Sequence, residues 1–175
     1  MSIHIIIDGY NLIRQSDALN ILDQQDIQLG RDALLDKLAI YKKIKHHRIT
    51  VVFDGASAPS FIQHKDRIQG IEVRFSRRGE LADTVIKNMA AMEREKALIV
   101  SSDHDIINFA SNQGAATISS PVFEKKIDMA EYMAVKGIDM ESEKNTGWIP
   151  TTKKKGPKKR LSKKDRRSRI KIRKL

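Results

Sequence analysis

The sequence predicts an α/β protein with a mainly parallel sheet and helices on both faces of that sheet. Short apolar segments rich in β-branched residues alternate with helical patterns through the first 136 residues, which is the order of repeated β–α–β units. Two of these segments end in Asp-Gly, and a later one runs into a cluster of acids. The predicted strands are residues 3–7, 49–53, 71–75, 97–100 and 115–118.

The predicted strands differ in the faces that they bury. Residues 3–7 form an unbroken apolar run, which is typical of a strand covered on both faces of a parallel sheet. Residues 71–75 alternate apolar and charged side chains, so this strand is expected nearer to an edge, with one wetter face.

Apolar residues at helical spacing mark the predicted helices. Residues 17–26 are polar and broken and predict no regular element. Serine or aspartate stands at the start of the later helices, where such residues cap exposed backbone N–H groups. Helices are expected over residues 28–45, 80–95, 103–112 and 119–136, with a short helix or loop over about 11–18.

Acidic residues follow the carboxyl ends of three predicted strands. Asp8 ends the first strand, Asp54 ends the second, and Asp103 and Asp105 follow the fourth. The carboxyl ends of parallel strands meet at one edge of the sheet, where open α/β sheets bind their ligands. Acids gathered there repel one another unless a cation lies between them, and hard cations such as Mg²⁺ prefer these oxygen ligands.

Asp83 and Glu80 extend this set, because they share the first turn of the helix over residues 80–95. Asp83 follows a strand end, so it is expected at the same edge as Asp8 and Asp103. Each acid also has a purely structural explanation: Asp-Gly is a common turn, aspartate is a natural N-cap, and first-turn acids complement the helix dipole. Those explanations account for single acids rather than for the whole set.

Basic residues near the same edge are candidates for holding phosphate. Arg77 and Arg78 follow the strand over residues 71–75, and guanidinium groups bind phosphate oxygens in a fork. The alternative is an exposed basic turn, and the two interpretations are equally open. Arg14 is a further candidate, whereas the His46-His47 pair is interpreted as a solvated basic helix end.

Composition excludes several classes of protein. The 175 residues contain no cysteine, which excludes disulfides, zinc-thiolate sites and iron–sulfur clusters. Neither a GxGxxG sequence after the first strand nor a GxxxxGK[ST] sequence is present, so a dinucleotide site or P-loop has no support. We see no signal peptide and no apolar run long enough to span a membrane, and we expect a cytoplasmic protein.

The charge is concentrated in the last 25 residues. Residues 151–175 contain 14 Lys and Arg and one acid, whereas the preceding 150 residues have a net charge of −2. We therefore expect a domain over residues 1–138, followed by an irregular linker and a basic tail over 139–175. The tail is expected to be disordered when free and to bind RNA by counterion release, with a solubility tail as the alternative. Its candidate RNA-binding residues are Lys153, Lys154, Lys155, Lys158, Lys159 and Arg160.

Four motifs together resemble a known family. They are Ile7-Asp8-Gly9-Tyr10-Asn11-Leu12, Val52-Phe53-Asp54-Gly55, Arg77-Arg78-Gly79-Glu80-Leu81-Ala82-Asp83 and Ser101-Ser102-Asp103-His104-Asp105. In this order they resemble the NYN-domain proteins of the PIN-like nuclease superfamily, and in particular the YacP-like branch of ribosome-associated endoribonucleases. The resemblance implies a PIN-like three-layer α/β/α fold and a metal-dependent ribonuclease.

The resemblance also assigns roles to residues. It implies that Asp8, Asp83 and Asp103 hold Mg²⁺ or Mn²⁺ and that Asn11 steadies the site, while Asp54 and Asp105 match less constant acids. The family usually has two adjacent acids where this chain has Asp83-Thr84, which leaves one ligand fewer. Glu80 is interpreted either as a general base or as a helix-start acid.

The expected function is therefore that of a divalent-metal-dependent endoribonuclease that cleaves mRNA or rRNA on or near the ribosome. The main alternative is a non-catalytic RNA- or ribosome-binding protein on the same fold. A Mg²⁺-dependent phosphatase or small-molecule hydrolase is a third interpretation, which leaves the basic tail unexplained.

Overall fold

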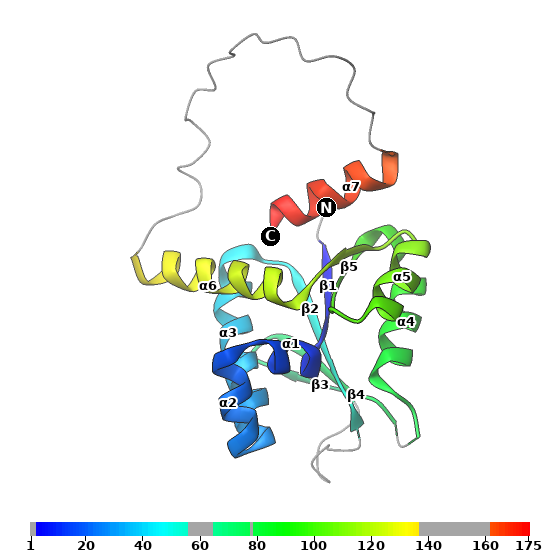
Figure 1. Cartoon of the computed structure of the whole chain (residues 1–175). Helices are drawn as coiled ribbons and strands as arrows, with labels where there is room; N and C mark the ends of the chain where they lie inside the picture. Colours follow the sequence, from blue (N-terminus) through cyan, green and yellow to red (C-terminus); the bar gives the residue numbers. More distant parts are fainter. Residues whose placement is uncertain (1–2, 56–64, 78, 137–161) are drawn as a thin grey trace.

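The computed structural model describes residues 3–55, 65–77, 79–136 and 162–175. Its centre is a six-stranded sheet in the order β3-β4-β2-β1-β5-β6 (Figure 1). Every neighbouring pair is parallel except β3 and β4, which are antiparallel. The strands are β1 (His4–Asp8), β2 (Arg48–Phe53), β3 (Lys65–Ile68), β4 (Ile71–Phe75), β5 (Ala97–Val100) and β6 (Ala116–Ile118).

Helices cover both faces of the sheet and form two separate cores. The larger core joins one face of the sheet to α1, α2, α3, α6 and the C-terminal residue, and the smaller core joins the other face to α4 and α5. These layers confirm the predicted three-layer α/β/α arrangement with a mainly parallel sheet. The helices are α1 (Gly9–Gln15), α2 (Asp17–Gln25), α3 (Ile27–Lys45), α4 (Ala82–Glu93), α5 (His104–Asn112), α6 (Ser120–Lys136) and α7 (Lys163–Lys174), with a 3₁₀ turn η2 (Arg94–Lys96).

The central strand explains why the sheet has two buried faces. Ile5 and Ile7 of β1 belong to the larger core, whereas Ile6 belongs to the smaller one, because successive side chains of a strand point to opposite faces. All three are fully buried, as the unbroken apolar run predicts. The carboxyl end of β1 then leads directly into α1.

Two elements differ from the sequence prediction. Residues 17–25 form the helix α2, which begins at the capping hydroxyl of Ser16 and buries mainly Leu19, so the prediction of a broken segment is wrong. The strand β3 was not predicted, because three of its four residues are charged. It pairs at the edge of the sheet, where exposed charged side chains are tolerated.

The end of the chain also differs from the prediction. Residues 163–174 form α7 rather than a disordered tail, and the side chain of Leu175 is only 4% exposed. The prediction of disorder is therefore wrong for this segment: a buried Leu175 and the partly buried Ile172 attach it to the larger core. The rest of the expected tail, residues 139–161, lies outside the described residues.

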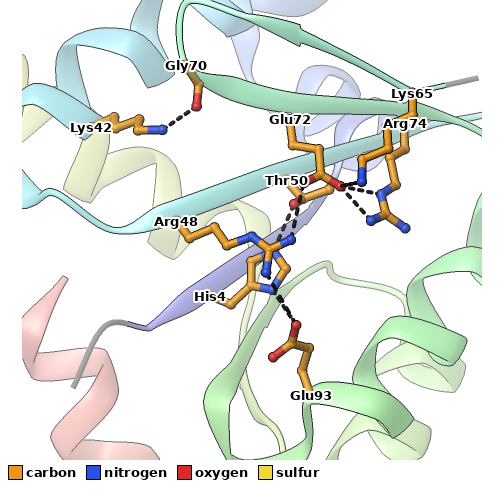
Figure 2. A network of polar contacts seen from close by, with 9 residues as sticks. All are labelled: His4, Lys42, Arg48, Thr50, Lys65, Gly70, Glu72, Arg74 and Glu93. Atoms are coloured by element: carbon orange, nitrogen blue, oxygen red, sulfur yellow. Dashed lines mark hydrogen bonds and ion pairs between the residues drawn. The ribbon is translucent and has the colours of Figure 1, made fainter. Parts of the chain in front are cut away.

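A network of polar side chains lies across β1, β2 and β4 (Figure 2). The carboxylate of Glu72 is 4% exposed and accepts hydrogen bonds from Arg74 at 2.6 Å and Arg48 at 3.2 Å. Burial by itself raises the pKa of Glu72, but the bonds and charges of these arginines outweigh it and lower the pKa to about 2. Beside them, His4 Nε2 lies 2.8 Å from the hydroxyl of Thr50. This buried carboxylate is thus neutralised inside the protein.

No helix in the described part of the chain is both long and apolar enough to cross a membrane.

Candidate functional site

A cleft of about 570 Å³ opens at the carboxyl edge of the parallel strands. Four of the predicted acids border it, together with polar and apolar side chains from α1, α3 and the start of α4. The lining residues are Asp8, Tyr10, Asn11, Arg14, Gln15, Ile27, Asp54, Leu81, Ala82, Asp83 and Asp103.

Asp8 is held where β1 passes into α1. Its Oδ1 atom accepts the backbone N–H of Asn11 at 3.2 Å, which caps α1, and its Oδ2 atom accepts the hydroxyl of Ser101 at 3.2 Å. The residue is only 9% exposed. Asp8 is therefore a rigidly positioned carboxylate at the floor of the cleft.

Two carboxylates of the cleft, Asp8 and Asp83, have raised pKa values. Burial raises the pKa of Asp8 to about 6, and the charges of Asp83 and Asp103 add to this rise against the two hydrogen bonds that Asp8 accepts. Burial also raises the pKa of Asp83, again with help from the charge of Asp103. Carboxylates that raise one another's pKa lie within electrostatic range of a common centre.

Asp103 combines a structural role with its place in the cleft. Its Oδ1 atom caps α5 by accepting the backbone N–H groups of Asp105 at 2.7 Å and Ile106 at 3.3 Å. The carboxylate of Asp105 instead forms an ion pair with Lys87, and this hydrogen bond raises the pKa of Lys87. Asp105 is thus mostly exposed and turned to α4, while Asp103 faces the cleft.

Asn11 connects three parts of the chain at the cleft. Its Oδ1 atom accepts the backbone N–H of Ser102 at 2.9 Å and the hydroxyl of Ser120 at 2.7 Å, and it also lies 3.3 Å from the donating amide of Gln15. Ser102 lies in the loop between β5 and α5, and Ser120 begins α6. One amide oxygen therefore fixes the loop that carries Asp103 against the helix that follows Asp8.

Close packing explains the glycine in the first motif. A Cβ atom on Gly9 would lie 2.3 Å from the ring of Phe53, so only glycine allows α1 to start this close to β2. The ring of Tyr10 packs edge-on against Phe53 at 5.1 Å, and its hydroxyl accepts a hydrogen bond from Arg31 Nε at 2.9 Å. These contacts hold the turn after β1 in one position, and they hold Asp8, which precedes the turn, in place as well.

Several predicted residues lie elsewhere. Arg77 and Glu80 border a neighbouring cavity rather than the acidic cleft, and Glu80 Oε2 accepts the backbone N–H of Arg77 at 3.3 Å. This bond favours the reading of Glu80 as a structural acid. Arg14 does line the cleft. Arg78 and the tail residues Lys153, Lys154, Lys155, Lys158, Lys159 and Arg160 lie outside the described residues.

The side chains of the cleft can be compared with the ligands that a divalent cation requires. Among the described residues, no group of three or more acidic, histidine or cysteine side chains is close enough together to hold a metal ion as it stands. The donor chemistry nevertheless fits, because Asp8, Asp83 and Asp103 offer hard carboxylate oxygens to one cleft. Mg²⁺ usually keeps several waters and needs only one or two carboxylates, and a cation here would offset the repulsion that helps raise the pKa of Asp8 and Asp83.

Sequence reasoning missed some contributors to this site. The hydroxyl of Ser101 both donates to Asp8 and accepts the backbone N–H of Asp103 at 3.1 Å, and Ser120 bonds Asn11 from 109 positions away. The place of Ser101 directly after a strand is a signal that could have found it. Ser120 gives no such signal, because its partner lies on a distant element.

The mostly parallel sheet with an acidic cleft at its carboxyl edge defines an α/β protein of the three-layer kind that the resemblance implies. The model of the YacP-like NYN domain matches residues 5–174. The chain therefore belongs to the YacP-like NYN family, as its motifs predict, and this membership supports a nuclease-like, RNA-related function.

Individual relatives agree with this assignment. Over 86 residues the chain is 33% identical to the uncharacterized protein YacP of Bacillus subtilis (strain 168), a match that covers 49% of this chain and spans half the length of that relative. A crystal structure of Rae1 (YacP) from Bacillus subtilis has a TM-score of 0.65 at 26% identity and covers 79% of this chain and 80% of that one. A mutant form of the same protein has a TM-score of 0.65 at 23% identity, with 83% and 87% covered, and shows the shared fold.

Proposed function

We propose that the chain is a divalent-metal-dependent endoribonuclease that cleaves RNA phosphodiester bonds at the carboxyl edge of its sheet. The observation that carries the proposal is the meeting of Asp8, Asp83 and Asp103 at one cleft, where Asp8 and Asp83 have raised pKa values. Like charges kept together in a partly buried cleft favour a cationic ligand. Family membership supports the choice of RNA as substrate.

Each residue then has a distinct task. Asp8, Asp83 and Asp103 would hold Mg²⁺ or Mn²⁺, which supplies an activated water and offsets charge on the phosphate. Asn11 positions the loop of Asp103 through its bond to Ser102. Arg14 is exposed on the cleft wall, where its guanidinium group can bind a phosphate beside the scissile one.

The proposed substrate is mRNA or rRNA on or near the ribosome, in the cytoplasm. The resemblance to ribosome-associated endoribonucleases and the strongly basic C-terminal segment support this choice. A basic segment binds RNA largely through phosphates and without reading its sequence, so the selection of a cleavage point would come from the complex in which the RNA is presented.

The direct test is cleavage of single-stranded RNA and of translating ribosome complexes with Mn²⁺, Mg²⁺ or EDTA. Wild type is compared with Asp8→Asn, and with Asp128→Asn as a matched control, because Asp128 lies on α6 outside the cleft and pairs with Lys37. Cuts that need metal and disappear only in Asp8→Asn support the nuclease. RNA binding without cuts in any protein would favour the main alternative, a non-catalytic RNA-binding protein on the same fold.

A further inference from the structure

The C-terminal helix α7 is attached to the domain by its last residues. Leu175 is buried in the larger core, and its carbonyl accepts a hydrogen bond from the Tyr41 hydroxyl at 3.2 Å. Ile172 packs against the same core, and α7 contacts β6. The position of α7 on the domain is therefore defined by an apolar anchor.

This anchor places α7 at the amino edge of the parallel strands. Arg167 forms an ion pair with Glu95, which precedes β5, and the carbonyl of Lys174 lies 3.4 Å from the ring of His47, which precedes β2. In Figure 1, α7 lies near the start of β1, while α1 follows the other end of that strand. The five residues of β1 separate the two edges by about 16 Å.

The two sides of α7 have different characters. Ser168, Lys171, Ile172 and Leu175 recur at helical spacing, are at least partly buried and form the docking side. The opposite side is an exposed cationic stripe, in which Arg166 and Arg173 lie about 10 Å apart along the helix. The stripe consists of Lys163, Arg166, Arg169 and Arg173.

Further cations gather near the C-terminal ends of α3 and α7, within range of Lys126 on α6. Burial lowers the pKa of Lys45, and the charge of Lys126 on α6 lowers it further. Burial also lowers the pKa of His47, against its bond to the Lys174 carbonyl, and the charges of Lys45 and Lys174 add to the fall. Positive groups here repel one another, and Asp165, the one acid of α7, is bonded to the Ser162 hydroxyl at the start of the helix.

We propose that the cationic stripe of α7 binds the phosphate backbone of RNA and anchors the substrate at the edge of the sheet opposite the acidic cleft. The proposal rests on the proposed function in taking RNA as the substrate. Three arginines on one exposed face suit phosphates, because each guanidinium can bind phosphate oxygens in a fork. A rigidly docked helix holds these groups in place, whereas its distance from the acids separates anchoring from chemistry.

The test compares two variants that each remove two positive charges. Arg169→Gln with Arg173→Gln changes the stripe, and glutamine keeps helix propensity close to that of arginine. Lys43→Gln with Arg67→Gln is the control, because Lys43 lies beside Gln69 at the β3–β4 turn and Arg67 is exposed on β3, at the lateral edge of the sheet away from β6. Affinity for a labelled single-stranded RNA is measured in EDTA at several salt concentrations, with circular dichroism to check the fold.

The stripe variant is expected to bind RNA about tenfold more weakly and to lose about 1.4 from the slope of log K against log salt, while the control changes little. In Mn²⁺ the stripe variant should show a raised KM with kcat unchanged. Equal affinities for all three proteins would overturn the proposal, as would a loss of binding to phosphatidylserine vesicles with RNA binding intact, since the stripe would then serve a membrane. Binding that behaves as expected in a protein without cleavage would contradict only the nuclease function.

Discussion

Each edge of the sheet gathers charged groups of one sign: acids at the carboxyl edge and cations at the amino edge. At the carboxyl edge, burial and neighbouring acids raise the pKa of Asp8 and Asp83. At the amino edge, burial and neighbouring cations lower the pKa of Lys45 and His47. Between them, Glu72 shows the opposite case, because arginines bonded to it lower its pKa (Figure 2). The comparison teaches that the charge of Glu72 is balanced by bonded arginines within the protein, whereas groups of like charge lie near one another at each edge.

The largest expected effect is that of Asp8→Asn. We expect cleavage to fall at least a hundredfold, while the metal-free variant is more stable than wild type by about 3 kcal/mol at pH 7. The pKa of about 6 in the folded protein lies above the usual aspartate value, so the cost of Asp8 to folding grows from about pH 4 and reaches its full size above pH 6. Urea unfolding in EDTA measures this difference.

The gain in stability of Asp8→Asn should also depend on pH. Below about pH 4 both folded and unfolded wild type carry a protonated Asp8, so the advantage of the variant should fade as the pH drops from 6 to 4. Asparagine can still accept the Asn11 N–H and can donate to Ser101. A variant that is less stable than wild type at pH 7 would show that the acidic edge carries no electrostatic strain.

A smaller effect is expected for Asn11→Ala. This change removes the acceptor of Ser102 N–H and the Ser120 hydroxyl, and leaving part-buried donors unpaired costs about 1 to 3 kcal/mol. Cleavage should fall because the loop of Asp103 loses its fixed place. Gln15→Ala is the control, since its bonds are exposed, and an equal loss of stability in both variants would argue against a special role for Asn11.

The balanced centre of the sheet provides a contrast in pH dependence. The pKa of Glu72 is lowered from 4.5 to about 2, so its contribution is present above pH 4.5 and is lost as the pH falls towards 2. Glu72→Gln should therefore reduce the loss of stability between pH 5 and pH 2, as followed by urea unfolding. An unchanged pH dependence would mean that Glu72 is not balanced by its arginines.

The smallest expected effect concerns the docking of α7. Tyr41→Phe removes the hydrogen bond to the carbonyl of Leu175 and should cost about 1 kcal/mol. Hydrogen exchange of the α7 amides should become faster, while exchange in β1 stays the same. Equal protection of α7 in both proteins would show that the apolar contacts of Leu175 alone hold the helix.

The sequence predicts the strands and the acids of this protein well, because both depend on local patterns. An apolar run such as residues 3–7 makes a buried strand, and an acid within a few residues of its end reaches the carboxyl edge, as Asp8 and Asp103 do. The helix α7 could not be predicted from a local pattern. Its order depends on the contact between Leu175 and Tyr41, which lie 134 positions apart in the sequence. No local pattern in a basic segment reveals that contact.

Side chains with two local explanations were also hard to assign. Glu80 stands three residues before Asp83 in the sequence, yet only Asp83 lines the acidic cleft, because Glu80 turns back to the backbone of Arg77. The bonds of Asn11 to Ser102 and Ser120 depend on tertiary packing in the same way. Sequence thus predicts which residue types reach an edge, whereas packing decides which side chains face the cleft.

The most direct test of the account measures the rate of RNA cleavage at saturating RNA in Mn²⁺, for wild type, Asp8→Asn and the Arg169→Gln/Arg173→Gln protein. We expect the saturated rate to be lost in Asp8→Asn and kept in the α7 variant, which needs only a higher RNA concentration to reach it. A saturated rate that survives in Asp8→Asn would contradict the assignment of the chemistry to the acidic edge.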